Sequence, residues 1–275
     1  MINQTLVLSA RALKKWIRNP AAVVPGLVTS IFYIALFGSS FNPTNLVPSG
    51  AGGAQVLQQA FGGAPTYITY LTAGVICLIL VFNMAFGGID LVLDRQLGFL
   101  STLLTAPIAR ASIFLSGVMQ NFVKAIFLGV LTFLIALLIP NGLELPAGFG
   151  ILDFLGVFLS FSLLGLGLSS VFTAIALSVK SIDSLVAIVN FLTLPLIFMS
   201  NALFPSTSFP LWLKDIADVN PISKANEAAR LLIINGNLSS SQLSTFTGDI
   251  LYLVGFVIVF GLIGYVAAEK ALGAK

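Results

Sequence analysis

The sequence predicts an all-α polytopic membrane protein with six transmembrane helices, and three observations support that fold class. Of the 275 residues, 57% are hydrophobic and only 8% are charged, whereas an average soluble domain has about 25% charged residues. Six apolar runs reach the length of about 20 residues that crosses about 30 Å of hydrocarbon as a helix. None of them shows the sustained alternation of a barrel strand. The six runs are 21–41, 67–88, 117–139, 154–177, 184–201 and 250–268.

Counts of particular residue types argue against several classes of site. The chain has no histidine, and its single cysteine, Cys77, lies inside an apolar run and is interpreted as a small buried hydrophobe. A zinc site, a haem ligand, a disulfide framework and a Ser-His or Cys-His pair are therefore not expected. The sequence has no Gly-x-x-x-x-Gly-Lys and no run of Lys and Arg. We expect neither ATP hydrolysis by this chain nor a nucleic-acid partner.

Lysine and arginine predict the orientation. Residues 1–20 carry four of them, the loop 42–66 has no charged residue, and the loops 89–116 and 178–183 carry cations again. Both termini are therefore expected on the cytoplasmic side of the cell (inner) membrane. The loop 202–249 has three cations, but its acidic residues nearly cancel them, and we place it outside. The cations that set this pattern are Arg11, Lys14, Lys15, Arg18, Arg95, Arg110 and Lys180.

Residues 2–19 are expected to form an amphipathic helix in the membrane interface. Leu6, Ala10, Leu13, Trp16 and Ile17 fall on one face, with the cations mostly on the other. Asn19-Pro20 ends the helix, because a residue before proline resists the α conformation. The alternative is a disordered basic tail that only sets topology.

The segment 90–116 is too polar for a span and too apolar for a free loop. Leu93, Leu97, Leu100 and Leu104 repeat at helical spacing, a break follows at Thr105-Ala-Pro107, and Arg110 begins a second short amphipathic stretch. A short helix across the cytoplasmic face suits docking into the groove of a partner. The alternative is a helical hairpin that caps the bundle.

The segment 202–248 is long for a loop without a structure of its own. Leu213, Ile216 and Ala217 are able to share one face of a short helix. We expect short re-entrant helices at the outer membrane edge, where protein or water must satisfy the irregular backbone.

The spans contain no centrally placed carboxylate, which argues against ion-coupled transport. Lys124 lies roughly two turns into the third span and is expected to snorkel or to pair with Asp90, a transport role being the alternative. The transport path is then apolar with scattered aromatic and polar groups, each of which simple packing would also explain. The candidates are Phe32, Tyr33, Phe37, Asn190, Phe191, Phe198 and Asn201.

Motifs in the two polar segments resemble those of type 2 ABC transporter permeases, which include drug-resistance and polysaccharide exporters. After the second span the family pattern of an acidic residue, glycine, leucines, Thr-Pro and arginine is matched by Asp94, Gly98, Leu103-Leu104, Thr105-Ala106-Pro107 and Arg110, with one extra residue between Thr and Pro. After the fifth span, Ser200-Asn-Ala-Leu-Phe-Pro205 has Asn201 in place of the usual glycine. The remaining matches are Pro210-Leu-Trp212-Leu213, Asn220-Pro221, Glu227 and Arg230.

The resemblance covers nearly the whole chain and implies a single permease domain, 1–275, that pairs with an identical or related permease. It implies two separate ATP-binding subunits, which would hold ATP and Mg and would dock on the cytoplasmic face. The first and fifth spans would line the path at the dimer interface. The coupling segment would contain Asp94, Arg95, Leu97, Gly98, Leu100, Leu104, Pro107 and Arg110. The interfacial gate helix would contain Leu13, Lys14, Trp16 and Arg18. The outer re-entrant motif would contain Pro205, Pro210, Trp212, Asn220, Pro221, Glu227 and Arg230.

The predicted function is export of a hydrophobic drug-like or lipid-like molecule. Export of a polysaccharide or lipid-linked glycan is the alternative within the family, since 23 Phe residues would furnish an aromatic path. An ion-coupled secondary carrier and an intramembrane enzyme are the alternatives from other classes. The lack of mid-membrane carboxylates and of an evident internal repeat argues against the carrier. The lack of histidine and of a nucleophile constellation argues against the enzyme.

Overall fold

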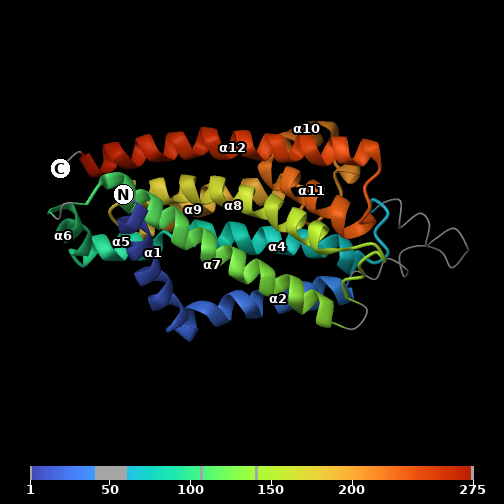
Figure 1. Ribbon diagram of the computed structural model, residues 1–275, viewed down its shortest axis with the longest axis horizontal. Helices are drawn as coiled ribbons and strands as arrows, with labels where there is room; N and C mark the ends of the chain where they lie inside the picture. Colours follow the sequence, from blue (N-terminus) through green and yellow to red (C-terminus); the bar gives the residue numbers. More distant parts are fainter. Residues whose placement is uncertain (1, 41–60, 106–107, 140–141, 274–275) are drawn as a thin grey trace, which may run out of the picture.

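The computed structural model describes residues 2–40, 61–105, 108–139 and 142–273, and within those ranges the chain is helical and contains no strand. Long helices run roughly parallel to one another, and both chain termini lie at one end of the molecule (Figure 1). That end is named the inner end, and the opposite end, where α11 and the start of α12 lie, is named the outer end. The predicted all-α class is confirmed.

The helices follow one another in short steps. In chain order they are α1 (Ile2–Ile17), α2 (Pro20–Ser40), α4 (Tyr67–Phe86), α5 (Ile89–Gln96), α6 (Phe99–Thr105), α7 (Arg110–Leu138), α8 (Ile151–Ser178), α9 (Ile182–Phe198), the 3-10 turn η2 (Ser206–Ser208), α10 (Leu211–Val219), α11 (Pro221–Asn235) and α12 (Ser240–Gly273).

Four helical segments in the described residues are long and apolar enough to cross a membrane: Tyr67–Gln96, Arg110–Leu138, Ile151–Ser178 and Ser240–Gly273. Two further apolar helices are shorter, Val23–Leu36 within α2 and Ile182–Phe198. The protein is thus a membrane protein with several apolar helices, and their positions match the six predicted runs.

Some helices extend well beyond the apolar runs that predicted them. Helix α7 begins at Arg110 although its run begins at 117, and α12 occupies Ser240–Gly273 although its run covers only 250–268. Hydropathy detects only the part of a helix that suits lipid, whereas backbone hydrogen bonds continue into the polar flanks. Arg110 therefore begins a long helix, and the expectation of a second short amphipathic stretch there was wrong.

Helix α8 lies at the centre of the bundle. Helices α12, α11, α7 and α4 all pack on it, and α2 packs mainly on α4 and α7. The interior is filled by large apolar side chains, among them Phe133, Phe161, Leu164, Leu168 and Phe172. Helices α2 and α9 lie at the edge of this bundle, and both expose stripes of large hydrophobic side chains. In a membrane such stripes contact lipid or another subunit.

The predicted leucine helix of the coupling segment is interrupted. Helix α5 ends at Gln96 and α6 begins at Phe99, so Leu97 and Gly98 form a corner between two short helices. Gly98 has a φ of 77°, in the left-handed region that residues other than glycine rarely adopt. The leucine repeat passes through this glycine, which is why periodicity alone predicted one helix.

Candidate functional site

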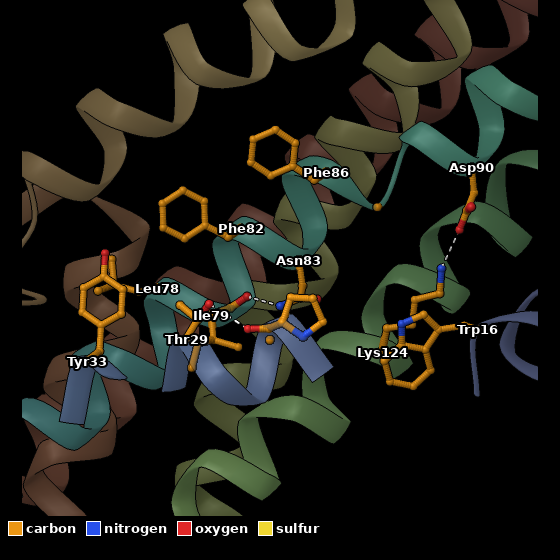
Figure 2. A pocket seen from close by; sticks show the side chains of 13 residues that line it. Trp16, Thr29, Tyr33, Leu78, Ile79, Phe82, Asn83, Phe86, Asp90 and Lys124 are labelled. Atoms are coloured by element: carbon orange, nitrogen blue, oxygen red, sulfur yellow. Dashed lines mark hydrogen bonds and ion pairs between the residues drawn. The ribbon is translucent and has the colours of Figure 1, made fainter. Parts of the chain in front are cut away.

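A cavity of about 420 Å³ lies between α2, α4 and α7, with α1 and α5 at its inner end. Figure 2 shows the side chains of Asp90 and Lys124 at one end of the cavity and Tyr33 at the other. It is named the membrane cavity. Its lining includes Trp16, Tyr33, Leu78, Ile79, Phe82, Asn83, Phe86, Asp90 and Lys124.

The walls of the membrane cavity combine aromatic and polar groups. Phe82 and Phe86 lie one helical turn apart on α4 with stacked rings 6.4 Å apart. Asn83 donates a hydrogen bond from Nδ2 to the Ile79 carbonyl oxygen at 2.9 Å, so its amide is partly satisfied within its own helix. A cavity with broad apolar surfaces and a few polar groups suits a hydrophobic or amphiphilic small molecule.

An ion pair closes the inner end of the membrane cavity. Lys124 Nζ lies 2.9 Å from Asp90 Oδ2, and Lys15 Nζ on α1 lies 3.8 Å from Asp90 Oδ1. The Lys124 side chain is only 7% exposed, whereas that of Asp90 is 41% exposed. The predicted pairing of Lys124 with Asp90 is confirmed. Loss of Asp90 would leave a buried ammonium group without its described partner, which is costly in a low dielectric.

Helix α1 contacts several of the elements near this ion pair. Trp16 is buried against Phe127 of α7, with the ring centroids 5.7 Å apart and the rings perpendicular. The Arg11 guanidinium lies 3.8 Å from the centre of the Phe99 ring on α6, a cation–π contact that joins α1 to the coupling segment. Together with the Lys15–Asp90 pair, these contacts link α1 to α5, α6 and α7.

The N-terminus of α7 is also held by α1. Gln4 Oε1 accepts hydrogen bonds from the Ala109 backbone N–H at 3.5 Å and from the Ser112 hydroxyl at 3.3 Å. Gln4 thereby ties α1 to the first turn of α7. Of the predicted gate residues, Trp16 packs inward, Leu13 is half-buried, and Lys14 and Arg18 are exposed.

The predicted apolar face of α1 is divided. Trp16 and Leu13 turn toward the protein, whereas Leu6, Ala10 and Ile17 are exposed. The helix therefore has one apolar side for α7 and a second, exposed apolar side. This arrangement suits a helix that rests against both protein and lipid.

The corner between α5 and α6, Leu97–Gly98, is named the coupling turn. Leu97 is 80% exposed, while Leu100 in the next helix is 3% exposed and packs into the core. Arg110 is exposed at the same end of the molecule. The side chain of Leu104 and the whole of Pro107 fall outside the described residues. The coupling turn thus exposes the apolar side chain of Leu97, while Leu100 anchors the following helix in the core.

Arg95 has a role that its sequence position did not reveal. Its guanidinium donates to the carbonyl oxygens of Leu177 and Val179, each at 2.6 Å, at the end of α8. Carbonyl groups in the last turn of a helix lack partners within the helix, and a cation there also suits the helix dipole. Arg95 therefore ties α5 to α8. Asp94 beside it is half-buried.

At the outer end, polar residues from α4, α11 and the segment after α9 form a buried cluster, named the outer polar cluster. Its centre is Arg230, which is 6% exposed and donates to the carbonyl oxygens of Tyr70 (3.1 Å), Asn201 (2.7 Å) and Ala202 (2.8 Å). The guanidinium also lies 3.6 Å from the centre of the Tyr70 ring. The members of the outer polar cluster are Tyr70, Asn201, Ser223, Glu227 and Arg230.

The outer polar cluster satisfies a backbone that has left the helix. Helix α9 contains Pro195 and ends at Phe198, after which the chain is irregular. The Asn201 backbone N–H donates to the Ser223 hydroxyl at 3.1 Å, and its side-chain amide donates to Glu227 at 3.2 Å. Carbonyl and N–H groups in an apolar environment require such partners. The motif after the fifth span therefore has a structural role, because it holds the irregular segment after α9 against α11.

Asn220 and Pro221 also connect the end of α9 to the start of α11. The Asn220 amide donates to the carbonyl oxygens of Leu196 (2.8 Å) and Met199 (3.0 Å), while its Oδ1 accepts from the Ile222 N–H at 2.9 Å. One side chain thus caps the start of α11 and the end of α9. Pro221 occupies the first position of α11, where a missing N–H is harmless.

Lys224 adds an ion network between α11 and α12. Its Nζ lies 3.0 Å from Glu227 Oε2 and 3.2 Å from Asp249 Oδ1. Although burial alone lowers the pKa of Lys224, the two carboxylates raise it above its usual range. The network holds the start of α12 against α11.

The other residues of the predicted outer motif lie at the surface. Trp212 and Leu211 of α10 are exposed, and Pro210 caps that helix. Pro205 lines a second cavity of about 260 Å³ that also touches Glu227 and Arg230. Helix α10 therefore presents an apolar face away from the cluster.

The structure brings only part of the predicted path together. Tyr33 lines the membrane cavity, but Phe32 points away on the exposed side of α2. Asn190, Phe191 and Phe198 are exposed on α9, and Asn201 belongs to the outer polar cluster. The side chain of Phe37 falls outside the described residues. The cavity residues that the sequence analysis missed are Phe82, Asn83 and Phe86, whose signal was a pair of aromatics one turn apart beside an asparagine in the second span.

Comparisons with known proteins indicate the family. The family model described as ABC-2 type transporter matches residues 3–234. A presumed transport permease of Cyanophora paradoxa, ycf38, is 28% identical over 98% of this chain and 89% of its own length. DrrC of Mycobacterium tuberculosis, a presumed doxorubicin resistance ABC transporter permease, is 24% identical over 96% of this chain and 88% of its own. The daunorubicin resistance ABC transporter permease DrrB1 of Streptomyces coeruleorubidus is 25% identical over 63% of this chain and 62% of its own.

Proposed function

The chain belongs to the ABC-2 type transporter family, and we propose that this membrane subunit exports a hydrophobic, drug-like or lipid-like molecule from the cytoplasm or inner leaflet. As a permease of that family it works with ATP-binding partner subunits. We propose two such subunits, which bind ATP and Mg, and a second permease, identical or related. We further propose six crossings of the cell membrane with both termini in the cytoplasm.

The membrane cavity is the observation on which the substrate class rests. Its volume of about 420 Å³ is within the range of small-molecule sites, and its walls include Tyr33, Phe82 and Phe86. The charged groups at its inner end, Asp90 and Lys124, neutralise one another. Such a lining favours an apolar or amphiphilic molecule over a strongly charged one.

Contacts at the inner end offer a path from ATP hydrolysis to the cavity. An ATP-binding subunit would bind the exposed Leu97, so movement of that subunit would displace α5 and α6. Arg11 and Lys15 would pass the displacement to α1, because they contact Phe99 and Asp90. Helix α1 supplies Trp16 to the cavity wall. Coupling would thus change the cavity at the end where substrate enters.

The exposed apolar stripes of α2 and α9 support pairing with a second permease. Phe32, Phe191 and Phe198 lie on these stripes and are exposed in the single chain. In the proposed dimer they would face the partner permease and line a path between the two copies.

Reconstituted transport tests the proposal. The chain and its co-purified ATP-binding subunit would be placed in proteoliposomes with the ATP-binding side outward, and uptake of a fluorescent hydrophobic amphiphile would be followed after ATP addition. We expect ATP-dependent uptake that falls at least tenfold when Phe82 and Phe86 are both changed to Ala. A control with Leu251→Ala and Leu262→Ala, which removes exposed apolar area from α12, should transport normally. Uptake by the lone chain under an ion gradient would overturn the proposal.

A further inference from the structure

Two cavities meet on the side of the molecule formed by α8, α9 and α12. One has a volume of about 350 Å³ and apolar walls that include Ile188, Phe260 and Ile263. The other, of about 830 Å³, is lined by Arg95, Gln96, Lys180 and Lys270 among others. Both are lined by Ser178 and Ala267, so they form one continuous groove. It is named the α8–α12 groove, and it shares no residue with the membrane cavity.

The inner end of the α8–α12 groove is basic. Lys180 lies in the turn between α8 and α9, Lys270 lies in the last turns of α12, and both are exposed. Neither lysine forms an ion pair with a residue that the structure describes. None of the described residues lining this end is acidic. Asp183 and Glu269 are close in sequence but do not line it. The inner end therefore attracts an anion.

The length of the groove matches one leaflet of a membrane. Phe260 in the apolar part and Lys270 at the basic end are ten residues apart in α12, which corresponds to about 15 Å along a helix. Half of a hydrocarbon layer is also about 15 Å. A molecule whose head lies at Lys270 would therefore place its tail beside Phe260 and end near the middle of the bilayer.

We propose that the α8–α12 groove binds an anionic phospholipid, with its phosphate between Lys180 and Lys270 and an acyl chain along the apolar walls. The surrounding surface of α12 is already suited to lipid, because Ile258, Leu262 and Val266 are exposed. Through its head the lipid would bridge the end of α12 and the α8–α9 turn, beside the Arg95 contact that holds α5 to α8. It would thereby stabilise the helices that support the coupling turn.

Native mass spectrometry of the intact purified chain tests the charged end. Phosphatidylglycerol and phosphatidylcholine with the same acyl chains would be titrated separately, and bound lipid counted. We expect tighter binding of phosphatidylglycerol. We expect Lys180→Gln and Lys270→Gln each to weaken it about fivefold, since a basic side chain near an anionic membrane surface contributes about that factor. Lys214→Gln, an exposed lysine on α10, is the matched control. Equal binding of the two lipids, or unchanged binding in both groove variants, would overturn the proposal.

A second pair of variants tests the apolar part. Ala267→Phe, which fills the junction of the two cavities, should abolish preferential phosphatidylglycerol binding although both lysines remain. If that variant unfolds, Ile188→Trp narrows the groove from its exposed rim.

A competition experiment and the oligomeric state test the other possible occupants of the groove. Glycerol phosphate without acyl chains should not compete with phosphatidylglycerol for binding. Competition by glycerol phosphate would show a free-phosphate site instead. A loss of dimer with unchanged lipid binding in Ile188→Trp would show that the groove holds a second copy of the chain. Either result contradicts the lipid assignment.

Discussion

The two ends of this molecule use their motif residues in opposite ways. At the outer end, Arg230 is buried and donates to three backbone carbonyl groups. At the inner end, Leu97 projects from the surface, and the Asp90–Lys124 pair borders a cavity. The outer residues around Arg230 bond within the chain, whereas the inner motif leaves Leu97 exposed to other molecules.

This difference separates a residue pattern that maintains the fold from one that serves function. An irregular backbone inside an apolar environment must be satisfied by its own protein, so the polar residues after α9 have structural partners. The turn at the inner end lies at the surface and is under no such demand, so its exposed leucine is available to the groove of a partner subunit. Substitutions at the outer end should therefore act on stability, and those at the coupling turn on activity.

The largest expected effect is that of Arg230→Met. The substitution removes three hydrogen bonds from a buried charged donor, although the Asn201 carbonyl oxygen keeps the Tyr70 hydroxyl as a donor. Hydrogen bonds from a charged group are worth about 1.5–3 kcal/mol each. We expect a loss of at least about 3 kcal/mol and little folded protein, measured by thermal unfolding and yield in detergent. Arg110→Met removes an exposed arginine at the other end and should leave the unfolding temperature unchanged. Similar unfolding temperatures for the two variants would contradict the statement that the outer end, unlike the inner end, depends on its arginine for stability.

Gly74→Ala should produce the next largest loss. A Cβ at Gly74 would lie 1.8 Å from the Ala202 carbonyl oxygen, which itself accepts from Arg230. Because a backbone atom must move, we expect a destabilisation of about 1–3 kcal/mol. The matched control is Gly255→Ala on α12, where an added Cβ meets no atom within 4 Å. If Gly74→Ala unfolds at the control's temperature, the close contact between α4 and the segment after α9 is not present.

Substitutions in the ion pair should have intermediate effects and should be unequal. Asp90→Asn leaves the buried Lys124 cation unpaired, and we expect a loss of about 2 kcal/mol, below the value for a fully buried pair because Asp90 is partly exposed. Lys124→Met removes the buried charge itself and leaves Asp90 near Lys15, so about 1 kcal/mol or less is expected. Chemical unfolding of both variants measures the difference. Parental stability in both would mean that the pairing is unimportant for folding.

Leu97→Asp should have the smallest effect on stability and a large effect on activity. Surface substitutions usually change stability by less than about 0.5 kcal/mol, and Leu97 has few contacts to lose because it is exposed. ATP hydrolysis in the reconstituted transporter should nevertheless lose its stimulation by substrate. Leu211→Asp, on the exposed face of α10, is the control that should keep stimulation. A Leu97→Asp transporter that still couples hydrolysis to substrate would show that the turn is not the contact.

Local pattern was sufficient for much of the fold. Apolar runs located the long helices, and the depth of Lys124 in its run predicted the pair with Asp90. Periodicity failed at Gly98, because one residue with positive φ ends a helix whose leucine repeat continues. Hydropathy likewise could not indicate where α7 begins or where α12 begins and ends, since these polar ends continue outside the apolar runs.

The candidate site was harder to predict, because its contacts join distant parts of the chain. The acceptors of Arg95 lie 82 and 84 residues away, so nothing near Arg95 indicated a helix cap. In the sequence, Phe82 and Phe86 are ordinary members of an apolar span. Only the packing of α2 beside α4 shows that they line a cavity. Phe191 and Phe198 were predicted from type and span alone, and their exposure becomes meaningful only beside a second subunit.

We propose above all that a separate ATP-binding subunit binds this permease at the coupling turn. A photo-reactive amino acid placed at position 97 or, as the outer-end counterpart, at position 212 tests it directly in the assembled, ATP-hydrolysing transporter. Both positions carry exposed side chains, and they lie toward opposite ends of the molecule (Figure 1). We predict an adduct with the ATP-binding subunit from position 97 and none from position 212. An adduct from position 212, or none from position 97 in a transporter that still moves substrate, would contradict the account.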